Sequence, residues 1–267
     1  MDNNEHNSKG QNRKSTSSSE LPRLYRDLAG WFDLVNPIGL VEDEAGLYRK
    51  LLVDACNMPP RTMLDLGAGA GHLAFFLKKE MDLTLVDLSP EMLALSRKIN
   101  PECEHIVGDY YSVRLGRQFD TVLFNDAVNY VAEEKDLRRA VETAFVHCAP
   151  GGAALFCPDV LRETFTPETF CKSNNDGDRS LRSLVWRREL EPTCDHYIME
   201  IVHLMLGKEE GEVKVVHDRH RMGAFSRAVW LTNLERAGFQ PRCISVRIGA
   251  QKEIVRDVFL GSKPSSL

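Results

Sequence analysis

Residues 62–77 read TMLDLGAGAGHLAFFL, an apolar run followed by three glycines and an amphipathic pattern. We expect a buried strand over 62–66, a sharp turn through Gly67, Gly69 and Gly71, and a helix from about residue 71. Glycine tolerates the positive φ angles of such a turn and lets a ligand approach bare backbone amides. The N-terminal N–H groups and positive dipole end of the helix point into the same turn. The stretch therefore predicts a cradle for a ligand with polar or negative groups at the carboxyl end of a strand.

The spacing of the glycines indicates which ligand the cradle holds. The dinucleotide fingerprint is G-x-G-x-x-G, whereas here the third glycine comes one residue early and His72 stands where that fingerprint needs glycine. Asp65 lies two residues before the first glycine, so the loop reads D-x-G-x-G-x-G. This pattern resembles the first motif of the class I methyltransferases that use S-adenosyl-L-methionine. In that family the acid lies beside the methionine part of the cofactor, and the loop backbone packs against it.

A second strand follows over 83–87 and ends at Asp87, 20 residues beyond Gly67. A carboxylate at this spacing can accept hydrogen bonds from both ribose hydroxyls of an adenosine ligand. Ser89 then caps a helix that has proline at its first position. Met92 and Leu93 resemble the apolar pair that packs on the adenine ring in that family, and Leu88 is also expected to contact the cofactor.

The next two strands supply the remaining cofactor contacts. The third, over 105–109, ends at Asp109, where the family often has an acid that binds the adenine amino group. The fourth, over 119–124, leads to the edge where an open α/β sheet places its chemistry, and the resemblance puts Asn125 and Ala127 beside the methionyl part. The complete predicted cofactor set is Asp65, Gly67, Ala68, Gly69, Gly71, Asp87, Leu88, Met92, Asp109, Tyr110, Asn125 and Ala127.

From residue 61 onward strand and helix patterns alternate, which predicts a parallel sheet with helices on both faces. A helix over 135–148, the turn at 150–152 and a strand over 153–157 continue a resemblance that covers about 28–160. Three alternating segments then predict an inserted antiparallel meander, and polar residues 172–179 are expected to be mobile. A helix over 225–237 and two closing strands complete an α/β fold: a seven-stranded, mostly parallel, doubly wound sheet with a C-terminal antiparallel hairpin. The meander strands are expected at 182–190, 197–206 and 213–222, and the closing strands at 243–248 and 254–260.

The chain start differs in composition. Residues 1–20 are polar and cannot bury enough surface to fold, so we expect a disordered tail. Residues 21–58 predict two helices, one around Trp31 and Phe32 and one from about 42 to 56. The run 28–34 resembles the N-terminal lid helix of small-molecule methyltransferases, with Phe32 in place of the tyrosine. The expected domains are the tail 1–20, lid helices and cofactor-binding core 21–160, a substrate cap 161–222, and the last part of the core 223–267.

Two residues are the candidates for catalysis. The segment 220–226, followed by the Ala-Gly-Phe at 237–239, resembles methyltransferases that act on amino sugars and similar small metabolites, and this implies that His220 faces the substrate. Tyr130 follows the fourth strand and is expected to begin the next helix within reach of a substrate. The expected reaction moves a methyl group to an N or O of a small molecule by in-line displacement, with positioning as the main contribution and a general base as the second. The alternatives are a nicotinamide- or flavin-dependent oxidoreductase, which His72 and Asp65 disfavour, and a non-catalytic S-adenosylmethionine-binding protein of the same fold.

Composition limits the other possibilities. A formal net charge of −5 lacks the basic footprint of a nucleic-acid-binding protein. Seven cysteines are scattered without a C-x-x-C pair, which predicts free thiols in a reducing cytosol and no metal site. No apolar run approaches the length of a membrane span and no signal-peptide core is present. We therefore expect a cytoplasmic protein with no membrane partner, and a homodimer remains open.

Overall fold

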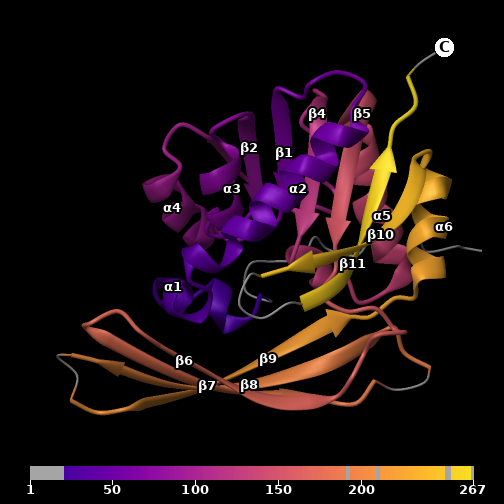
Figure 1. The fold of residues 1–267 in the computed structure, drawn as a ribbon. Helices are drawn as coiled ribbons and strands as arrows, with labels where there is room; N and C mark the ends of the chain where they lie inside the picture. Colours follow the sequence, from indigo (N-terminus) through magenta and orange to yellow (C-terminus); the bar gives the residue numbers. More distant parts are fainter. Residues whose placement is uncertain (1–20, 191–192, 209–210, 250–253, 266–267) are drawn as a thin grey trace, which may run out of the picture.

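The computed structural model describes residues 21–190, 193–208, 211–249 and 254–265, so the tail predicted over 1–20 lies outside the described residues. The described chain forms two sheets, one of seven strands in the order β10-β11-β5-β4-β1-β2-β3 and one of four strands in the order β6-β7-β8-β9. In Figure 1, β4 and β5 point with their carboxyl ends toward the four-stranded sheet, which lies below the α/β body.

The seven-stranded sheet has the predicted topology. Its parallel strands are β1 (Thr62–Leu66), β2 (Asp82–Asp87), β3 (Glu104–Val107), β4 (Phe119–Asn125) and β5 (Cys148–Cys157). β4 is the central strand of the seven, and β1 lies beside it and pairs in parallel with both β4 and β2. β10 (Gln240–Ile248) and β11 (Ile254–Ser262) form the C-terminal hairpin, and β11 runs antiparallel to β5. The predicted fold class is therefore confirmed.

Helices cover both faces of this sheet, which explains why its strands are apolar on both sides. α5 (Glu134–His147) and α6 (Arg227–Ala237) cover one face, where the ring of Trp230 stacks on Phe259 with centroids 5.0 Å apart. α2 (Glu42–Ala55) and α3 (His72–Leu77) cover the other, with Tyr48 and Leu52 fully buried. Ser89 is the N-cap of α4 (Pro90–Ile99), and its hydroxyl oxygen accepts a hydrogen bond from the Met92 amide.

The N-terminal segment corrects one prediction. The second predicted helix is present as α2, but the first is replaced by three short pieces: the 3-10 turns Arg23–Tyr25 and Ala29–Trp31, and α1 (Phe32–Val35). Arg26 leaves the helical region at φ −128° and ψ −106°. A short isolated helix gains little from its own hydrogen bonds. The contacts that this segment makes with both sheets, described below, therefore decide its path.

The four-stranded sheet corrects a second prediction. β6 (Glu168–Asn175), β7 (Arg179–Arg187), β8 (His196–Gly207) and β9 (Lys214–Gly223) form a continuous antiparallel meander. Residues 172–179 were expected to be mobile, yet residues 172–175 belong to β6, which pairs with β7 along its whole length. Because the ladder is made by main-chain groups, polar side chains do not prevent an edge strand from forming. Residues 176–178 form the turn between the two strands, and Arg179 begins β7.

Two boundaries near the predicted site also differ. The third strand ends at Val107, so Asp109 lies in the loop beyond it. Tyr130 does not begin α5 but ends a 3-10 turn, η5 (Ala127–Tyr130), and α5 starts at Glu134. This turn is closed by the Asn129 amide on the Asp126 carbonyl and the Val131 amide on the Val128 carbonyl.

All seven cysteines are free thiols. Within the described ranges, no group of three or more His, Cys, Asp or Glu side chains is placed to hold a metal ion. No helix in the described part of the chain is both long and apolar enough to span a membrane.

An ionic network around the largely buried pair of Arg256 and Glu44 joins the hairpin to α2. Arg256 of β11 donates to Glu44 (2.8 Å) and pairs with Asp159 (3.1 Å), which follows β5. The Tyr48 hydroxyl donates to the same Glu44 oxygen (2.7 Å). Burial raises the pKa of Glu44, and the charge of Arg256 opposes this. The network thus ties three distant parts of the chain together beside the carboxyl end of β5.

Replacing Arg256 with Met removes the cation that both carboxylates share. We expect the free energy of unfolding to fall by about 3–5 kcal/mol, because one partner of a buried pair is left uncompensated. Urea unfolding measures this. The control is Arg242→Met, which changes an exposed arginine on β10 and is expected to cost less than about 0.5 kcal/mol. Equal stability of the wild type and the Arg256→Met variant would show that the network contributes nothing net.

Candidate active site

The glycine loop after β1 has the predicted turn. Gly67, Gly69 and Gly71 have φ angles of +77°, +55° and +73°. The amides of Gly67 and Ala68 both donate to the Val86 carbonyl (2.7 and 3.0 Å), which fixes the loop to the end of β2. The three glycines are required for different reasons, as the space around them shows.

Gly67 and Gly71 are required by packing within the protein. A Cβ on Gly67 would lie 2.1 Å from the Ala127 Cβ, and a Cβ on Gly71 would lie 2.2 Å from the Ser96 hydroxyl oxygen. A Cβ on Gly69 would meet only the Met92 Cε, at 3.7 Å. Gly69 is therefore the glycine that borders open space.

Asp87 connects the glycine loop to the start of α4. Its Oδ2 accepts the Gly69 amide and its Oδ1 accepts the Ser89 amide, both at 2.8 Å. Burial raises the pKa of Asp87, and these amides act in the opposite direction. The glycine loop thus holds the Asp87 carboxylate at the end of β2. Both the loop and the carboxylate are predicted to bind the same ligand.

The ends of four neighbouring strands bring polar groups into one row. Asp65 is the penultimate residue of β1 and is only 3 % exposed. Asn125 ends β4 and is also buried, and its Oδ1 has no hydrogen-bond partner among the residues that the structure describes. Beyond β3, the Gly108 amide donates to the main-chain carbonyl of Asp87 (2.9 Å), which places Asp109 next in the row. Since the strand order is β4-β1-β2-β3, the row reads Asn125, Asp65, Asp87 and Asp109.

The electrostatics of the row are those of buried acids. Burial, followed by the charge of Asp87, raises the pKa of Asp65 to about 7. Burial also raises the pKa of Asp109, whose Oδ1 accepts the Tyr111 amide (2.8 Å). Burial raises the pKa of all three acids on this edge, so the site is suited to a ligand that carries cationic or hydroxyl groups.

Apolar groups border the row. Met92 is fully buried and clusters with Ala29 and Ala70, and the rings of Tyr25 and Phe32 pack against this cluster. The Ser89 hydroxyl donates to the Tyr25 carbonyl (2.6 Å). The N-terminal segment therefore lies against the glycine loop and the start of α4. The other predicted contacts complete this border: Leu88 is half-buried, Tyr110 packs on Phe124 with ring centroids 4.8 Å apart, and Ala127 faces Gly67.

The two predicted catalytic residues are in contact. The Tyr130 hydroxyl and the His220 Nδ1 share a hydrogen bond of 2.7 Å. The chain of bonds extends to Tyr25, whose hydroxyl lies 2.8 Å from that of Tyr130, and to Asp218, whose Oδ2 lies 3.2 Å from the His220 Nε2. His220 and Asp218 are 2 % and 4 % exposed, so this chain runs from a half-buried tyrosine into the protein.

The hydrogen-bond partners of Asp218, His220 and Tyr130 indicate where the protons lie in this series. Burial acts to raise the pKa of Asp218, but His220 and the amides of Leu24 and Arg23 outweigh it and hold the pKa at about 2. Asp218 is therefore ionised at neutral pH and can only accept, so the His220 Nε2 carries a proton. Burial, followed by the influence of Tyr25, raises the pKa of Tyr130, which keeps its hydroxyl protonated.

Sequence reasoning missed Tyr25 and Asp218. Asp218 lies two residues before His220 on β9, so both side chains lie on the same face of the strand. That spacing is a signal that points to Asp218. Tyr25 carries no comparable local signal, because its hydrogen bonds to Tyr130 and Ser89 join residues more than sixty positions apart.

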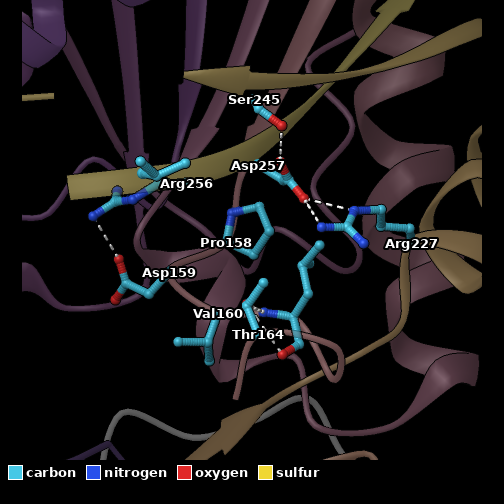
Figure 2. Close-up of a pocket in the computed structure, with 10 residues that line it drawn as sticks. Pro158, Asp159, Val160, Thr164, Arg227, Ser245, Arg256 and Asp257 are labelled. Atoms are coloured by element: carbon cyan, nitrogen blue, oxygen red, sulfur yellow. Dashed lines mark hydrogen bonds and ion pairs between the residues drawn. The ribbon is translucent and has the colours of Figure 1, made fainter. Parts of the chain in front are cut away.

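A small pocket of about 120 Å³ lies between the segment after β5 and the C-terminal hairpin (Figure 2). It is enclosed by residues 158–161 after β5 and by the C-terminal hairpin, with the ion pairs Arg227–Asp257 (2.6 Å) and Arg256–Asp159 (3.1 Å) in its wall. Asp159 also accepts the Asn129 side-chain amide (2.9 Å). The pocket is thus connected to η5, which carries Tyr130.

The fold and the loop at the end of β1 define the class: a class I methyltransferase fold with the D-x-G-x-G-x-G loop. Residues 63–152 match the family model described as a methyltransferase domain. Residues 63–152 are thus similar to a methyltransferase domain, and the match includes the glycine loop and the row of polar strand ends. The match favours a methyltransferase over the oxidoreductase alternative.

Two curated relatives are amino-sugar enzymes. The chain is 35 % identical over 125 residues to the dTDP-3-amino-3,4,6-trideoxy-alpha-D-glucopyranose N,N-dimethyltransferase of Streptomyces venezuelae, covering 46 % of this chain and 51 % of that protein. It is 26 % identical over 171 residues to the dTDP-3-amino-3,6-dideoxy-alpha-D-glucopyranose N,N-dimethyltransferase of Streptomyces fradiae, covering 62 % of this chain and 65 % of that protein. The chain thus matches between half and two thirds of the length of these relatives.

Solved structures share the fold over a longer range. DesVI of Streptomyces venezuelae has a TM-score of 0.77 at 23 % identity, covering 89 % of this chain and 97 % of that chain. The sugar N-methyltransferase KedS8 from Streptoalloteichus sp ATCC 53650 has a TM-score of 0.77 at 22 % identity, covering 94 % and 97 %. The coverage shows that the fold shared with these proteins extends beyond residues 63–152.

Gly69 offers a test of the cradle. We expect Gly69→Val to lose measurable binding of S-adenosylhomocysteine while unfolding cooperatively, because the added side chain enters the open space that the loop borders. Calorimetric titration measures the binding. The matched control is Gly116→Val, which imposes a β-branched residue at a similar φ of +68° where no atom lies within 4 Å, and which precedes the opposite end of β4. Normal binding by Gly69→Val would remove the loop from the cofactor site.

Proposed function

We propose that this protein transfers a methyl group from S-adenosyl-L-methionine to an N or O atom of a small molecule, with an amino sugar as the favoured acceptor class. The observation that carries the proposal is the arrangement at one edge of the sheet. The row Asn125–Asp65–Asp87–Asp109 lies there, and so does η5, whose Tyr130 is bonded to His220 of the four-stranded sheet. The names of the two curated relatives support the amino-sugar acceptor.

The residues of the row suit the cofactor. Asp87 would accept the ribose hydroxyls, Asp109 the adenine amino group, and Met92, Leu88 and Tyr110 would border the base. Asp65 and the unpartnered Oδ1 of Asn125 would accept hydrogen bonds from the α-ammonium group of the methionine part. Gly67, Ala68, Gly69, Gly71 and Ala127 would border it with backbone or small side chains. When bound, the cofactor supplies a methyl group already activated on a sulfonium.

The protein's own contribution is to orient the acceptor and to receive its proton. Holding the acceptor atom in line with the methyl group removes most of the entropic part of the barrier. Tyr130 stays protonated, so it would accept the acceptor's proton only while it passes its own to His220. Such general-base assistance is worth about 10²–10⁴-fold in rate.

We propose that the meander, residues 161–222, is the substrate cap, and that the N-terminal segment is a lid on the cofactor. Trp31 packs with Leu181, Met205 and Val216 of the meander, while Phe32 packs beside Ala70 of the glycine loop. Two adjacent residues of the segment thus contact the two sheets. Covering the reacting atoms in this way excludes water.

Turnover tests the proposal. The protein is incubated with S-adenosyl-L-methionine and a panel of nucleotide-linked amino sugars, and mass spectrometry follows S-adenosylhomocysteine and methylated product. We expect one or two methyl groups on an amino sugar and none on the matched sugar that has hydrogen in place of the amine. Binding of S-adenosyl-L-methionine without turnover on any amine or hydroxyl acceptor would favour the non-catalytic alternative.

The raised pKa of Asp65 predicts a pH dependence of cofactor binding. The pKa of about 7 in the folded protein lies above the ordinary carboxyl value, so below pH 7 the free site holds Asp65 protonated. A cation that binds the carboxylate lowers this pKa, so binding releases a proton and becomes tighter as pH rises. We expect the Kd for S-adenosylhomocysteine to fall by up to about tenfold per pH unit below 7 and to level off above it.

Two controls isolate Asp65 in this measurement. Adenosine has the ribose that Asp87 is predicted to bind but lacks the methionine part, so its Kd should not fall as the pH rises toward 7. The Asp65→Asn variant should bind S-adenosylhomocysteine with a flat profile over the same range. If the Kd of the wild type shows the same pH dependence as that of Asp65→Asn, Asp65 does not bind the methionine part.

A further inference from the structure

Asp218 is a buried carboxylate with four hydrogen-bond donors from two parts of the chain. Its Oδ1 accepts the amides of Arg23 (3.1 Å) and Arg219 (3.0 Å). Its Oδ2 accepts the amide of Leu24 (3.0 Å) and faces the Nε2 of His220 (3.2 Å). A buried charge is costly unless such donors satisfy it. Two of the four come from the N-terminal segment, so the segment is part of what keeps Asp218 ionised.

The bonds around Asp218 form a closed circuit. From Asp218 they pass to His220, then to Tyr130 (2.7 Å), and then to the hydroxyl of Tyr25 (2.8 Å). Tyr25 follows Leu24 directly, so the circuit begins and ends in the same three-residue turn. The hydrogen-bonded series from Asp218 through His220 to Tyr130 contains both predicted catalytic residues. Residues 23–25 contact this series at both of its ends.

The same turn also reaches the cofactor side. The Tyr25 carbonyl accepts the Ser89 hydroxyl (2.6 Å), and the Ser89 amide donates to Asp87 (2.8 Å). One short segment thus spans from the carboxylate predicted to bind the ribose to the carboxylate that supports His220.

We infer that Asp218 is a positioning residue that couples docking of the N-terminal segment to the orientation of His220. This inference rests on the proposed methyl transfer. With residues 23 and 24 docked, Asp218 is satisfied and holds the Nε2 proton of His220, so that Nδ1 faces the Tyr130 hydroxyl. With the segment undocked, Asp218 loses two of its donors and His220 loses a fixed partner. The site is therefore assembled for proton transfer only when the segment covers the cofactor.

The proton balance of the step shows why the charge of Asp218 matters. In the proposed reaction the acceptor atom would form a bond to the methyl carbon while the bond from that carbon to the sulfonium sulfur breaks and leaves its electron pair on sulfur, and the acceptor would lose a proton. That proton passes to the Tyr130 oxygen while the Tyr130 proton passes to His220 Nδ1, and no other group changes its proton count. The result is an imidazolium in a buried site, which is unfavourable without an adjacent negative charge. Asp218 provides that charge without itself touching the acceptor.

The first test removes the charge and keeps the shape. We expect Asp218→Asn to lower kcat by about 100-fold while the KM for the acceptor changes by less than about threefold, because the loss falls on proton transfer. Asp218→Glu keeps the charge and should recover part of kcat. Hydrogen exchange of residues 21–31 supplies a readout independent of activity: it should be faster in Asp218→Asn than in the wild type.

The second test removes one amide and leaves Asp218 and His220 in place. Arg23 begins a 3-10 turn after Pro22, a position where proline is tolerated. Arg23→Pro lacks the N–H that bonds Asp218, and Arg23→Ala keeps it, although both lose the pair with Asp27. We expect the kcat of Arg23→Pro to lie about tenfold below that of Arg23→Ala. Asp27→Ala, which breaks the same exposed pair from its other side, should retain wild-type kcat.

The outcomes separate this inference from the proposed function. A wild type that binds S-adenosyl-L-methionine but methylates nothing overturns the function, and the inference with it. An active wild type whose kcat survives both Asp218→Asn and Arg23→Pro overturns the inference alone. A purely structural role for the segment predicts that Arg23→Pro raises the KM for S-adenosyl-L-methionine and leaves kcat equal to that of Arg23→Ala, which also overturns it. If Asp218→Asn does not fold, the Arg23 pair decides.

Discussion

The hydrogen bond from the Gly69 amide to the Asp87 carboxylate holds the site together. It joins the loop after β1 to the loop after β2, and the second oxygen of Asp87 extends the connection to the start of α4. Because Asp87 lies among these amides, its charge can be retained at a half-buried strand end. The positive φ of Gly69 presents its N–H to Asp87 and leaves open space on the side where a Cβ would stand. The turn therefore satisfies the protein's own carboxylate and makes room for a ligand.

Asp218 repeats this device in the second sheet. It too is an acid held by main-chain amides from a different part of the chain. The N-terminal segment contacts both acids, Asp218 directly and Asp87 through Ser89. The two sheets are thus connected at the site by one short stretch of backbone, in addition to the contact of Tyr130 with His220. A change in the position of that stretch acts on both halves of the site.

Local pattern predicted the parts of this protein that are determined locally. The glycine loop, the apolar strands and the capped helix after Ser89 depend on residues close in sequence, and the structure has them as predicted. The prediction of a first N-terminal helix was wrong, because contacts with Asp218 and the glycine loop outweigh a weak helical preference over so few residues. The prediction missed β6 because its side chains are largely polar and show no apolar alternation. An edge strand needs only its backbone groups to pair. Tyr25 was missed because its partners lie on β9, η5 and α4, which no sequence spacing reveals.

The turn at the end of β4 connects the two halves of the site at a cost in backbone energy. Asp126 has φ +43° and ψ −51°, outside the regions that L residues ordinarily occupy. Such a conformation costs about 1–3 kcal/mol and persists only where its surroundings impose it. Here the next residue, Ala127, is pressed against Gly67, where no side chain would fit. The turn that follows is closed by Asn129, whose side chain bonds Asp159 in both directions. These constraints place Asn125 in the cofactor row and, five residues later, Tyr130 against His220. The strain at Asp126 is therefore the cost of presenting one strand end to both the cofactor and the acceptor.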